Sequence, residues 1–191
     1  FTYRYGGSGA SHGGLGGRMR RNNGQRWTNT NPWPPERPPT YGDLAITTLQ
    51  PGSGGGSTHR AGGGAGGGAI KLAAGGAGRV HISATGRITV NGGNAGNENN
   101  PETAGAGSGG SICISGASIN NEGSLVAKGG VSVRANNDWG GESSGGNGGG
   151  GRIAFHTSGE LNIGNVDVQG GGRVSNYGIL VTGGELLGDS I

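Results

Sequence analysis

Histidine and carboxylate side chains are the first places to look for chemistry, because they act as general acids and bases and as metal ligands. The four histidines are His12, His59, His81 and His156. No two of them have the His-x3-His spacing found in many zinc sites. Asp167 and Arg152 could form the acidic and basic pair of a polysaccharide-cleaving enzyme, but paired carboxylates do not recur at one repeat position. We therefore predict no catalytic residue, no metal site and no enzymatic activity.

Calcium and phosphate sites are the other chemical candidates. Asn136, Asp138 and Glu142 could offer oxygen ligands to one calcium ion, but the tandem aspartate pattern of calcium-binding β-helices is missing. Glycine runs bind phosphate when a helix and usually a lysine follow them, whereas strand-like segments follow these runs. Cys113 has no second cysteine to pair with, and alternation turns it away from its isoleucine neighbours. The sequence therefore predicts no cofactor.

Composition limits the class of protein. Glycine supplies 51 of the 191 residues, well above its usual share of about 7%. Low hydrophobicity indicates disorder mainly when the net charge is high, and here the net charge is +3. The arginines between Arg18 and Arg26 lack repeated Arg-Gly-Gly triplets, so we expect a solvated loop and no nucleic-acid partner. No apolar run approaches the roughly 18 residues of a membrane span, so we expect no membrane insertion.

A repeat organises the middle of the chain. Ile70, Ile112 and Ile153 lie 42 and 41 residues apart, and each follows a glycine run and opens an alternating apolar segment. Alternation indicates half-buried strands, and a period of about 40 residues is typical of repeat architectures. The first repeat is about five residues longer, which adds an extra strand candidate at Val80–Ile82. No segment has the 3.6-residue apolar period of a helix.

Aligning the repeats places apolar residues at equivalent inward positions. Stacked copies would bury these side chains against each other, since one copy alone is too small to form a core. Glycine suits the corners, where it accepts positive φ, and permits close backbone approach in the runs 62–68 and 145–151. The sequence predicts an all-β, glycine-rich β-solenoid, β-helix-like, with short strands and long Gly-rich loops. The predicted core ladder is Ile70, Leu72, Ile88, Val90, Ile112, Ile114, Leu125, Ile153, Phe155, Val166 and Val168.

Three regions are expected along the chain. Residues 1–43 would hold an N-terminal strand, a Gly/Arg-rich segment and a Pro/Trp arm, in which five prolines within residues 32–39 favour polyproline II. Residues 44–176 would form the solenoid repeats. Residues 177–191 would form a C-terminal apolar strand or cap. The chain opens on Phe1 and not on methionine, from which we expect a processed, secreted product.

The order of several motifs adds a family resemblance. The motifs are Gly6-Gly-Ser-Gly-Ala-Ser-His-Gly-Gly14, Tyr41-Gly-Asp-Leu44, Gly52-Ser-Gly-Gly-Gly56, Gly68-Ala-Ile-Lys-Leu72, Gly109-Gly-Ser-Ile-Cys-Ile114 and Gly150-Gly-Arg-Ile-Ala154. In this order they resemble glycine-rich β-solenoid repeat proteins of cell surfaces and extracellular appendages, over most of residues 6–172. The resemblance implies a secreted structural or adhesive role. The Pro/Trp arm is not part of the resembling pattern.

The first functional hypothesis is a structural subunit or segment of an extracellular filament or cell-surface layer, built by end-to-end stacking and strand exchange with copies of itself. The alternative is a glycan-binding adhesive module that uses Trp33, Trp139 and Tyr41 as stacking platforms. A polysaccharide-active solenoid enzyme is the third hypothesis. Either of the first two is expected at the cell surface or outside the cell. The predicted subunit interface is Phe1, Tyr3, Tyr5, Trp27, Trp33, Ile179, Leu180 and Val181.

Overall fold

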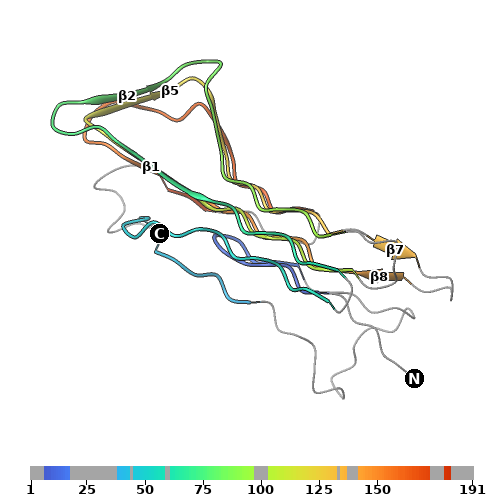
Figure 1. Ribbon diagram of the computed structural model, residues 1–191. Helices are drawn as coiled ribbons and strands as arrows, with labels where there is room; N and C mark the ends of the chain where they lie inside the picture. Colours follow the sequence, from blue (N-terminus) through green and yellow to red (C-terminus); the bar gives the residue numbers. More distant parts are fainter. Residues whose placement is uncertain are drawn as a thin grey trace.

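The computed structural model describes residues 7–17, 38–43, 45–58, 61–96, 103–132, 134–136, 142–172 and 179–181. Within these ranges the protein is all-β and contains no helix. Its strands have two to five residues, and most of them belong to three parallel sheets (Figure 1). The all-β prediction is confirmed.

The sheets are built from strands far apart in sequence. The first has the order β1-β4-β9-β12, with bounds Ala69–Ala73, Ser111–Ser115, Arg152–His156 and Ile179–Val181. The second has the order β2-β5-β10, with bounds Arg79–Ile82, Ser118–Asn121 and Leu161–Asn162. The third has the order β3-β6-β11, with bounds Arg87–Thr89, Ser124–Val126 and Asn165–Asp167. A separate antiparallel pair consists of β7 (Arg134–Asn136) and β8 (Glu142–Ser144).

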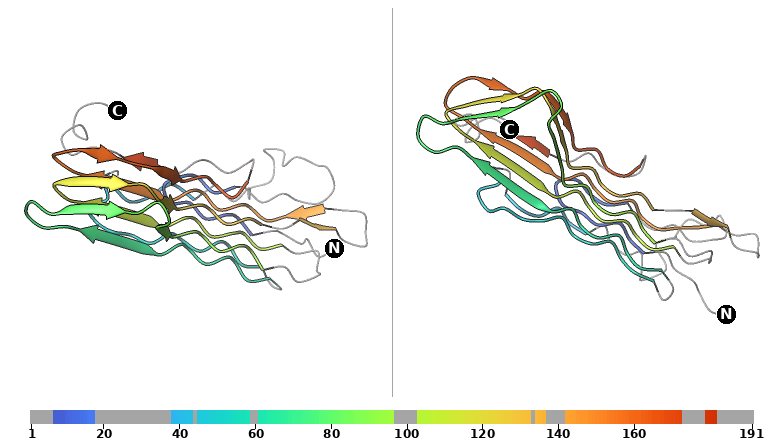
Figure 2. Two further views of the ribbon diagram at one scale, coloured as in Figure 1. Left: turned by 90° about the horizontal axis from the view of Figure 1, so that it is seen from above. Right: turned by 45° about the horizontal axis from the view of Figure 1, so that its top comes forward.

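Consecutive strands enter the three sheets in turn and then return to the first sheet. We call the resulting groups repeat 1 (β1, β2, β3), repeat 2 (β4, β5, β6) and repeat 3 (β9, β10, β11). Figure 2 shows these repeats lying above one another, with β12 next to β9. The strand expected as an extra at Val80–Ile82 is therefore not an addition to repeat 1. It lies in β2, and β5 and β10 are its counterparts in the other repeats.

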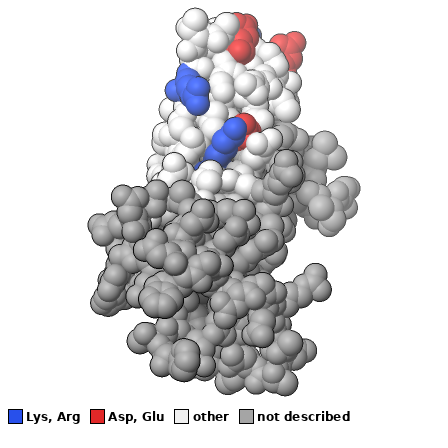
Figure 3. All heavy atoms as spheres, turned by 90° about the vertical axis from the view of Figure 1, so that its right-hand side faces the viewer, with Lys and Arg blue, Asp and Glu red and all other residues white. Residues whose placement is uncertain are grey.

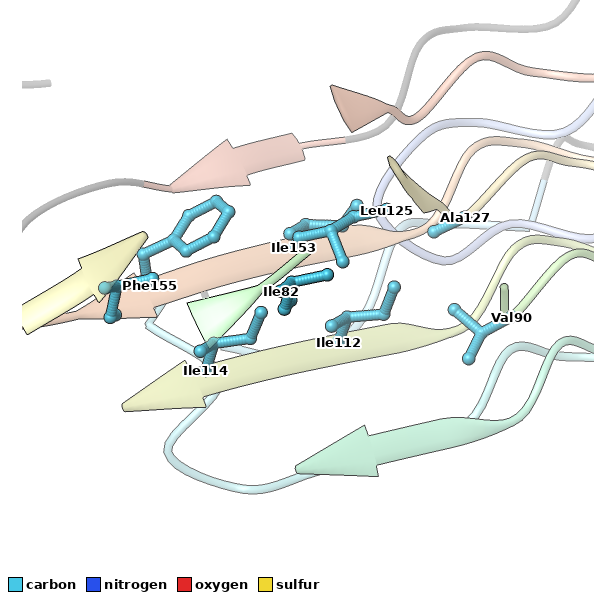
Figure 4. Close-up of a cluster of buried hydrophobic side chains, with 9 residues drawn as sticks. Ile82, Val90, Ile112, Ile114, Leu125, Ala127, Ile153 and Phe155 are labelled. Carbon is cyan, nitrogen blue, oxygen red and sulfur yellow. The ribbon is translucent and has the colours of Figure 1, made fainter. Parts of the chain in front are cut away.

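The register sets apolar residues of the three repeats side by side. Ile70 pairs with Ile112, which pairs with Ile153. The rows Leu72–Ile114–Phe155 and Ile88–Leu125–Val166 are formed in the same way. A further row, Val80–Ile119–Leu161, joins the same core, although Ile119 and Leu161 are not part of the ladder predicted from the sequence. In Figure 4 the labelled side chains of repeats 2 and 3 meet in one interior.

Glycine-rich segments continue from the strands and lie side by side as a second body of the molecule, which we call the glycine layer (Figure 1). Its centre is the segment 103–110, in which every residue is buried. From Gly105 to Gly110, successive backbone N–H groups donate in turn to three neighbouring segments, residues 53–56, 146–149 and 90–93. Each segment therefore accepts from every third N–H. Three further neighbours donate to its carbonyls: residues 7–10, 64–67 and Gly130. A period of three residues is that of polyproline II, whose backbone makes no internal hydrogen bonds.

Glycine is required in this layer because the backbones approach closely. A Cβ atom on Gly110 would overlap the carbonyl oxygen of Gly68 and would lie 2.7 Å from the carbonyl carbon of Gly67. Gly110 does not have a positive φ, so its need for glycine is steric and not conformational. Among the described glycines only Gly42, Gly76 and Gly164 have a positive φ. Close packing therefore accounts for more of the described glycines than corners do.

Two other segments pack on this framework. Residues 7–17, part of the region 1–43 separated by the sequence analysis, lie inside the glycine layer and bond to residues 103–106 and 146–150. Residues 38–43 and 45–50, which we call the strap, cross the outer face of β4 and β9. Ile46 and Leu49 of the strap pack against Cys113 and Ala154. The strap is thereby tied to the first sheet.

Candidate functional site

The sides of the three sheets that pair with no further described strand form a candidate site. We call the outer sides of β1, β2 and β3 the first end, and those of β10, β11 and β12 the second end. At the first end the described residues pair with no further strand. At the second end β12 covers β9, whereas β10 and β11 are edge strands among the described residues. An unpaired strand edge presents backbone donors and acceptors to another chain.

Burial differs between the middle and the ends of the stack. In repeat 2, Ile112, Ile114 and Leu125 are fully buried. Their counterparts in repeat 1, including Ile70, Leu72 and Ile88, are only partly buried. In repeat 3, Val166 and its neighbours Leu161, Ile163 and Val168 are also partly buried. Apolar side chains at both ends therefore keep surface that a further repeat would cover.

At the two ends of the third sheet, the hydrogen bonds show which backbone N–H and C=O groups point away from the neighbouring strand. Ser124 N–H donates to Gly86 O, and Val90 N–H donates to Val126 O. In a parallel pair alternate residues bond to one neighbour, so the N–H groups of Arg87 and Thr89 face away from β6. The same alternation turns Leu125 toward β11 and leaves the backbone of Val166 facing outward.

The predicted interface residues fall in two groups. Phe1, Tyr3, Tyr5, Trp27 and Trp33 lie outside the described residues, as does Trp139 of the glycan hypothesis. Ile179, Leu180 and Val181 form β12, which pairs with Arg152, Ile153 and Ala154 of the same chain. The intermolecular role of β12 stays a prediction, whereas its pairing with β9 is a feature that the repeat pattern had not included.

A buried polar cluster joins the strap to β9. Arg152 is 3% exposed, and its guanidinium donates from Nη2 to Tyr41 O at 2.6 Å and from Nη1 to Asp43 O at 3.1 Å. Burial lowers the pKa of Arg152, and the nearby Asp43 opposes that change. Among the described residues, Arg152 Nε and Gln50 Oε1 have no hydrogen-bond partner. Both atoms lie near Gly42, within 3.5 and 2.9 Å of the position that a Cβ would take there.

His12 belongs to the same cluster and is completely buried. Its Nδ1 lies 2.9 Å from Gly109 O, so this nitrogen carries the proton, and its ring lies 4.8 Å from that of Tyr41. Burial lowers the pKa of His12, the Gly109 hydrogen bond opposes this, and the charge of Arg152 adds to the lowering. Nε2 lies 3.5 Å from Ser111 Oγ, but Ser111 donates its proton to Gln50 O at 2.6 Å.

The Ser111–His12 contact is therefore not arranged as a nucleophile and base. Both side chains are buried, and the Asp43 carboxylate bonds to Thr47 and Thr48 instead of orienting His12. These hydrogen bonds lower the pKa of Asp43. The cluster acts as a clamp that fixes the strap and residues 7–17 to β4 and β9.

The remaining chemical candidates are not brought together in the described residues. Asp167 forms an ion pair with Lys128 at 2.6 Å and does not contact Arg152. His81 bonds to Asn120 of the neighbouring strand, and His156 bonds to Ala45 O of the strap. Where the chain is described, no three His, Cys, Asp or Glu side chains gather as a metal-ligating group. Cys113 is buried beside the strap, and burial raises the pKa of its thiol.

The described part of the surface has few features suited to a glycan or a polyanion. The described part of the face in Figure 3 carries separate charges of both signs and no basic patch. A groove of about 600 Å³ is lined by small and polar residues: Ala74, Gly76, Gly116, Ala117, His156, Thr157 and Ser158. Tyr41 directs its hydroxyl to Pro51 O and packs its ring on His12. In the part of the chain that is described, no helix has the length and apolar character needed to cross a bilayer.

Comparison with protein-family models, with curated proteins and with solved structures finds no match to this chain. Among the described features, the strand edges at the two ends of the sheets are the ones best suited to bind another chain.

Proposed function

We propose that the protein is a glycine-rich β-solenoid that serves as a structural subunit or segment of an extracellular filament or cell-surface layer, with copies that assemble end to end. The course of the chain supports the solenoid: strands enter three parallel sheets in turn, and equivalent residues stack at intervals of one repeat. The extracellular setting follows from the family resemblance. The filament follows from the ends of the sheets.

One observation carries the proposal: at both ends of the same stack there are strand edges that pair with no further described strand and are bordered by partly buried apolar side chains. The ends are different surfaces, so their contact is heterologous. A heterologous contact that does not close into a ring generates a fibre. A structural role fits this arrangement, because it needs no catalytic group and uses the whole stack.

The outward-facing backbone donors and acceptors of the two ends are also complementary. Extending the register Ile88–Leu125–Val166 by one repeat would set Val166 opposite Ile88 of a second copy. The outward N–H of Val166 would then meet the carbonyl of Arg87, and the N–H of Thr89 would meet the carbonyl of Val166. This is the pairing that already joins β3 to β6 and β6 to β11, so a second copy can continue the third sheet.

Gly68→Ala tests this proposal without disturbing the fold. A Cβ on Gly151 would meet Gly110 O, and a Cβ on Gly110 would meet Gly68 O, so each points to the preceding repeat. A Cβ on Gly68 meets no described atom within 4 Å and, by the same register, points out of the first end. Alanine at position 68 is expected to leave the monomer folded and to block the approach of a second copy.

The experiment compares wild type, Gly68→Ala and the exposed control Val131→Ala by sedimentation velocity and electron microscopy over a range of concentrations. We expect filaments from wild type and from the control. Gly68→Ala should stay monomeric and give an unchanged circular dichroism spectrum and a denaturation midpoint no lower than that of wild type. Wild type that stays monomeric at every concentration contradicts the proposed function, as does normal filament growth by Gly68→Ala.

A further inference from the structure

Strand β12 lies where the first strand of a second copy would have to lie. If repeat 1 of another molecule continued the stack at the second end, its β1 would pair with β9 as β4 does on the other side. That position is held by β12 of the same chain. We propose that β12 is a removable cap on the second end and that β1 of a second copy displaces it. This inference rests on the proposed end-to-end assembly and adds its regulation.

The cap covers β9 incompletely. β12 pairs with Arg152, Ile153 and Ala154 and leaves Phe155 and His156 without a partner on that side among the described strands. On its other side β9 pairs through all five of its residues with β4. β1 also has five residues, and all five pair with β4. An incoming β1 can therefore pair with the whole length of β9, whereas β12 uses three positions.

The outward-facing backbone N–H and C=O groups of β1 are placed to bond to β9 of a second copy. Ser111 N–H donates to Gly68 O, and Ala74 N–H donates to Ser115 O. Alternation then turns the backbone groups of Ala69, Lys71 and Ala73 away from β4. In β9, Arg152 N–H donates to Gly110 O, so the groups of Ile153 and Phe155 face the second end. Residues 69, 71 and 73 of a second copy would bracket these two residues.

The second and third sheets favour the exchange further. β12 adds no strand to β10 or β11, and the apolar residues Leu161, Val166 and Val168 near them keep exposed surface. A second copy brings β2 and β3 together with β1. Within the molecule, repeat 1 pairs with repeat 2 at five, four and three positions in the three sheets. Displacing three pairs of β12 thus allows pairing across three sheets.

Two variants of β12 test the cap by different chemistry. Leu180→Asp puts a carboxylate at the register position opposite Ile153, in the row of the core ladder. Val181→Pro removes an N–H that, by alternation, bonds to β9. Each is expected to weaken the cap and to raise the rate of filament elongation about tenfold, which corresponds to a modest loss of strand pairing. Ile70→Asp, in the incoming strand, is expected to lower the rate by about the same factor or more.

Elongation is followed by light scattering after addition of wild-type seeds, with Val131→Asp as an exposed control and with denaturation midpoints to verify folding. Faster growth of both β12 variants, together with slower growth of Ile70→Asp, is the expected result. Unchanged or slower growth of the β12 variants overturns the cap while wild-type filaments still support the proposed function. Slower growth would make β12 an intermolecular strand, as the sequence analysis predicted. Failure of wild type and of every variant to assemble overturns both proposals.

Discussion

His12 shows how one side chain ties distant segments together. It comes from the glycine-rich N-terminal region, yet its ring bonds to the carbonyl of Gly109 and contacts Tyr41 of the strap. A protonated imidazole there would be a buried charge beside the positive charge of Arg152, and these two effects outweigh the hydrogen bond to Gly109 O. The neutral ring is therefore the form that the folded protein favours.

This preference predicts that the protein becomes less stable as the pH falls through the ordinary histidine range. The pKa of His12 is lowered from 6.5 by burial, so below that pH the unfolded chain binds a proton that the folded chain does not. The contribution of His12 to the free energy of unfolding is thus present in full above pH 6.5. It falls as the pH decreases toward the lowered pKa, with a slope of at most about 1.4 kcal/mol per pH unit. Urea denaturation between about pH 8 and pH 5 measures this slope.

His12→Gln should flatten that pH dependence, because glutamine does not titrate. His81→Gln, at an exposed position, is the control for losing an imidazole. Asp43 acts in a different range: its pKa is lowered from 3.8, mainly by the Thr48 N–H, so its contribution is lost only at more acidic pH. An unchanged slope in His12→Gln would show that another group controls stability in the histidine range.

At the scale of elements, the segment 103–110 is the centre of the glycine layer. It bonds to six neighbouring stretches of chain, and a three-residue period directs its N–H groups to three of them. Its alanines, Ala104 and Ala106, are completely buried. The glycine layer is thus held together by hydrogen bonds from one backbone segment to several neighbours, and not by a β-sheet or by the packing of large side chains.

Gly110→Ala is predicted to destabilise the folded protein by about 3 kcal/mol or more, because its Cβ would overlap backbone atoms that cannot move without breaking neighbouring hydrogen bonds. Gly68→Ala is the matched control, since Gly68 has the same position in repeat 1. Its Cβ is free of contacts, so its effect should be within about 1 kcal/mol, in the stabilising direction. Chemical denaturation of both variants checks this, and equal effects would contradict the steric account.

At the scale of the whole molecule, stability is expected to vary along the stack. Repeat 2 has a neighbour on both sides and a completely buried set of apolar residues. Among the described strands, repeat 1 has no outer neighbour in any of the three sheets, and repeat 3 has none in the second and third sheets. In a stacked protein each repeat is stabilised mainly by its direct neighbours, so the ends open more readily than the middle.

Hydrogen exchange of the monomer should therefore find the amides of β5 and β6 at least about tenfold better protected than those of β2 and β3. In filaments the difference should shrink, because β2 and β3 gain partners there. Mass spectrometry of proteolytic fragments, or NMR, provides the measurement. Equal protection of all three repeats in the monomer would show that the stack opens only as one unit.

The sequence alone determined the positions of the strands of the first and third sheets and much of the core. Alternating apolar residues around Ile70, Ile112 and Ile153 mark strands with one inward apolar face, and this property is local to each repeat. In β4 and β9 the other face is buried as well, because the strap packs on it. Their spacing of 42 and 41 residues predicted which residues would be equivalent, and the register pairs these three. The row containing Ile119 and Leu161 is not predicted by this pattern, because each of them is the single apolar residue of a short polar strand.

The tertiary structure alone decided how the glycine runs pair, where β12 lies and how the polar cluster forms. Glycines carry no side chain to distinguish one run from another, so a run cannot specify its neighbours by pattern; the strands attached to it bring particular backbones together. His12, Tyr41 and Arg152 meet only because the strap and residues 7–17 fold back onto β9, across more than 100 residues of chain in the case of Arg152 and Tyr41. Contacts of that kind depend on the path of the whole chain, which local residue patterns do not encode.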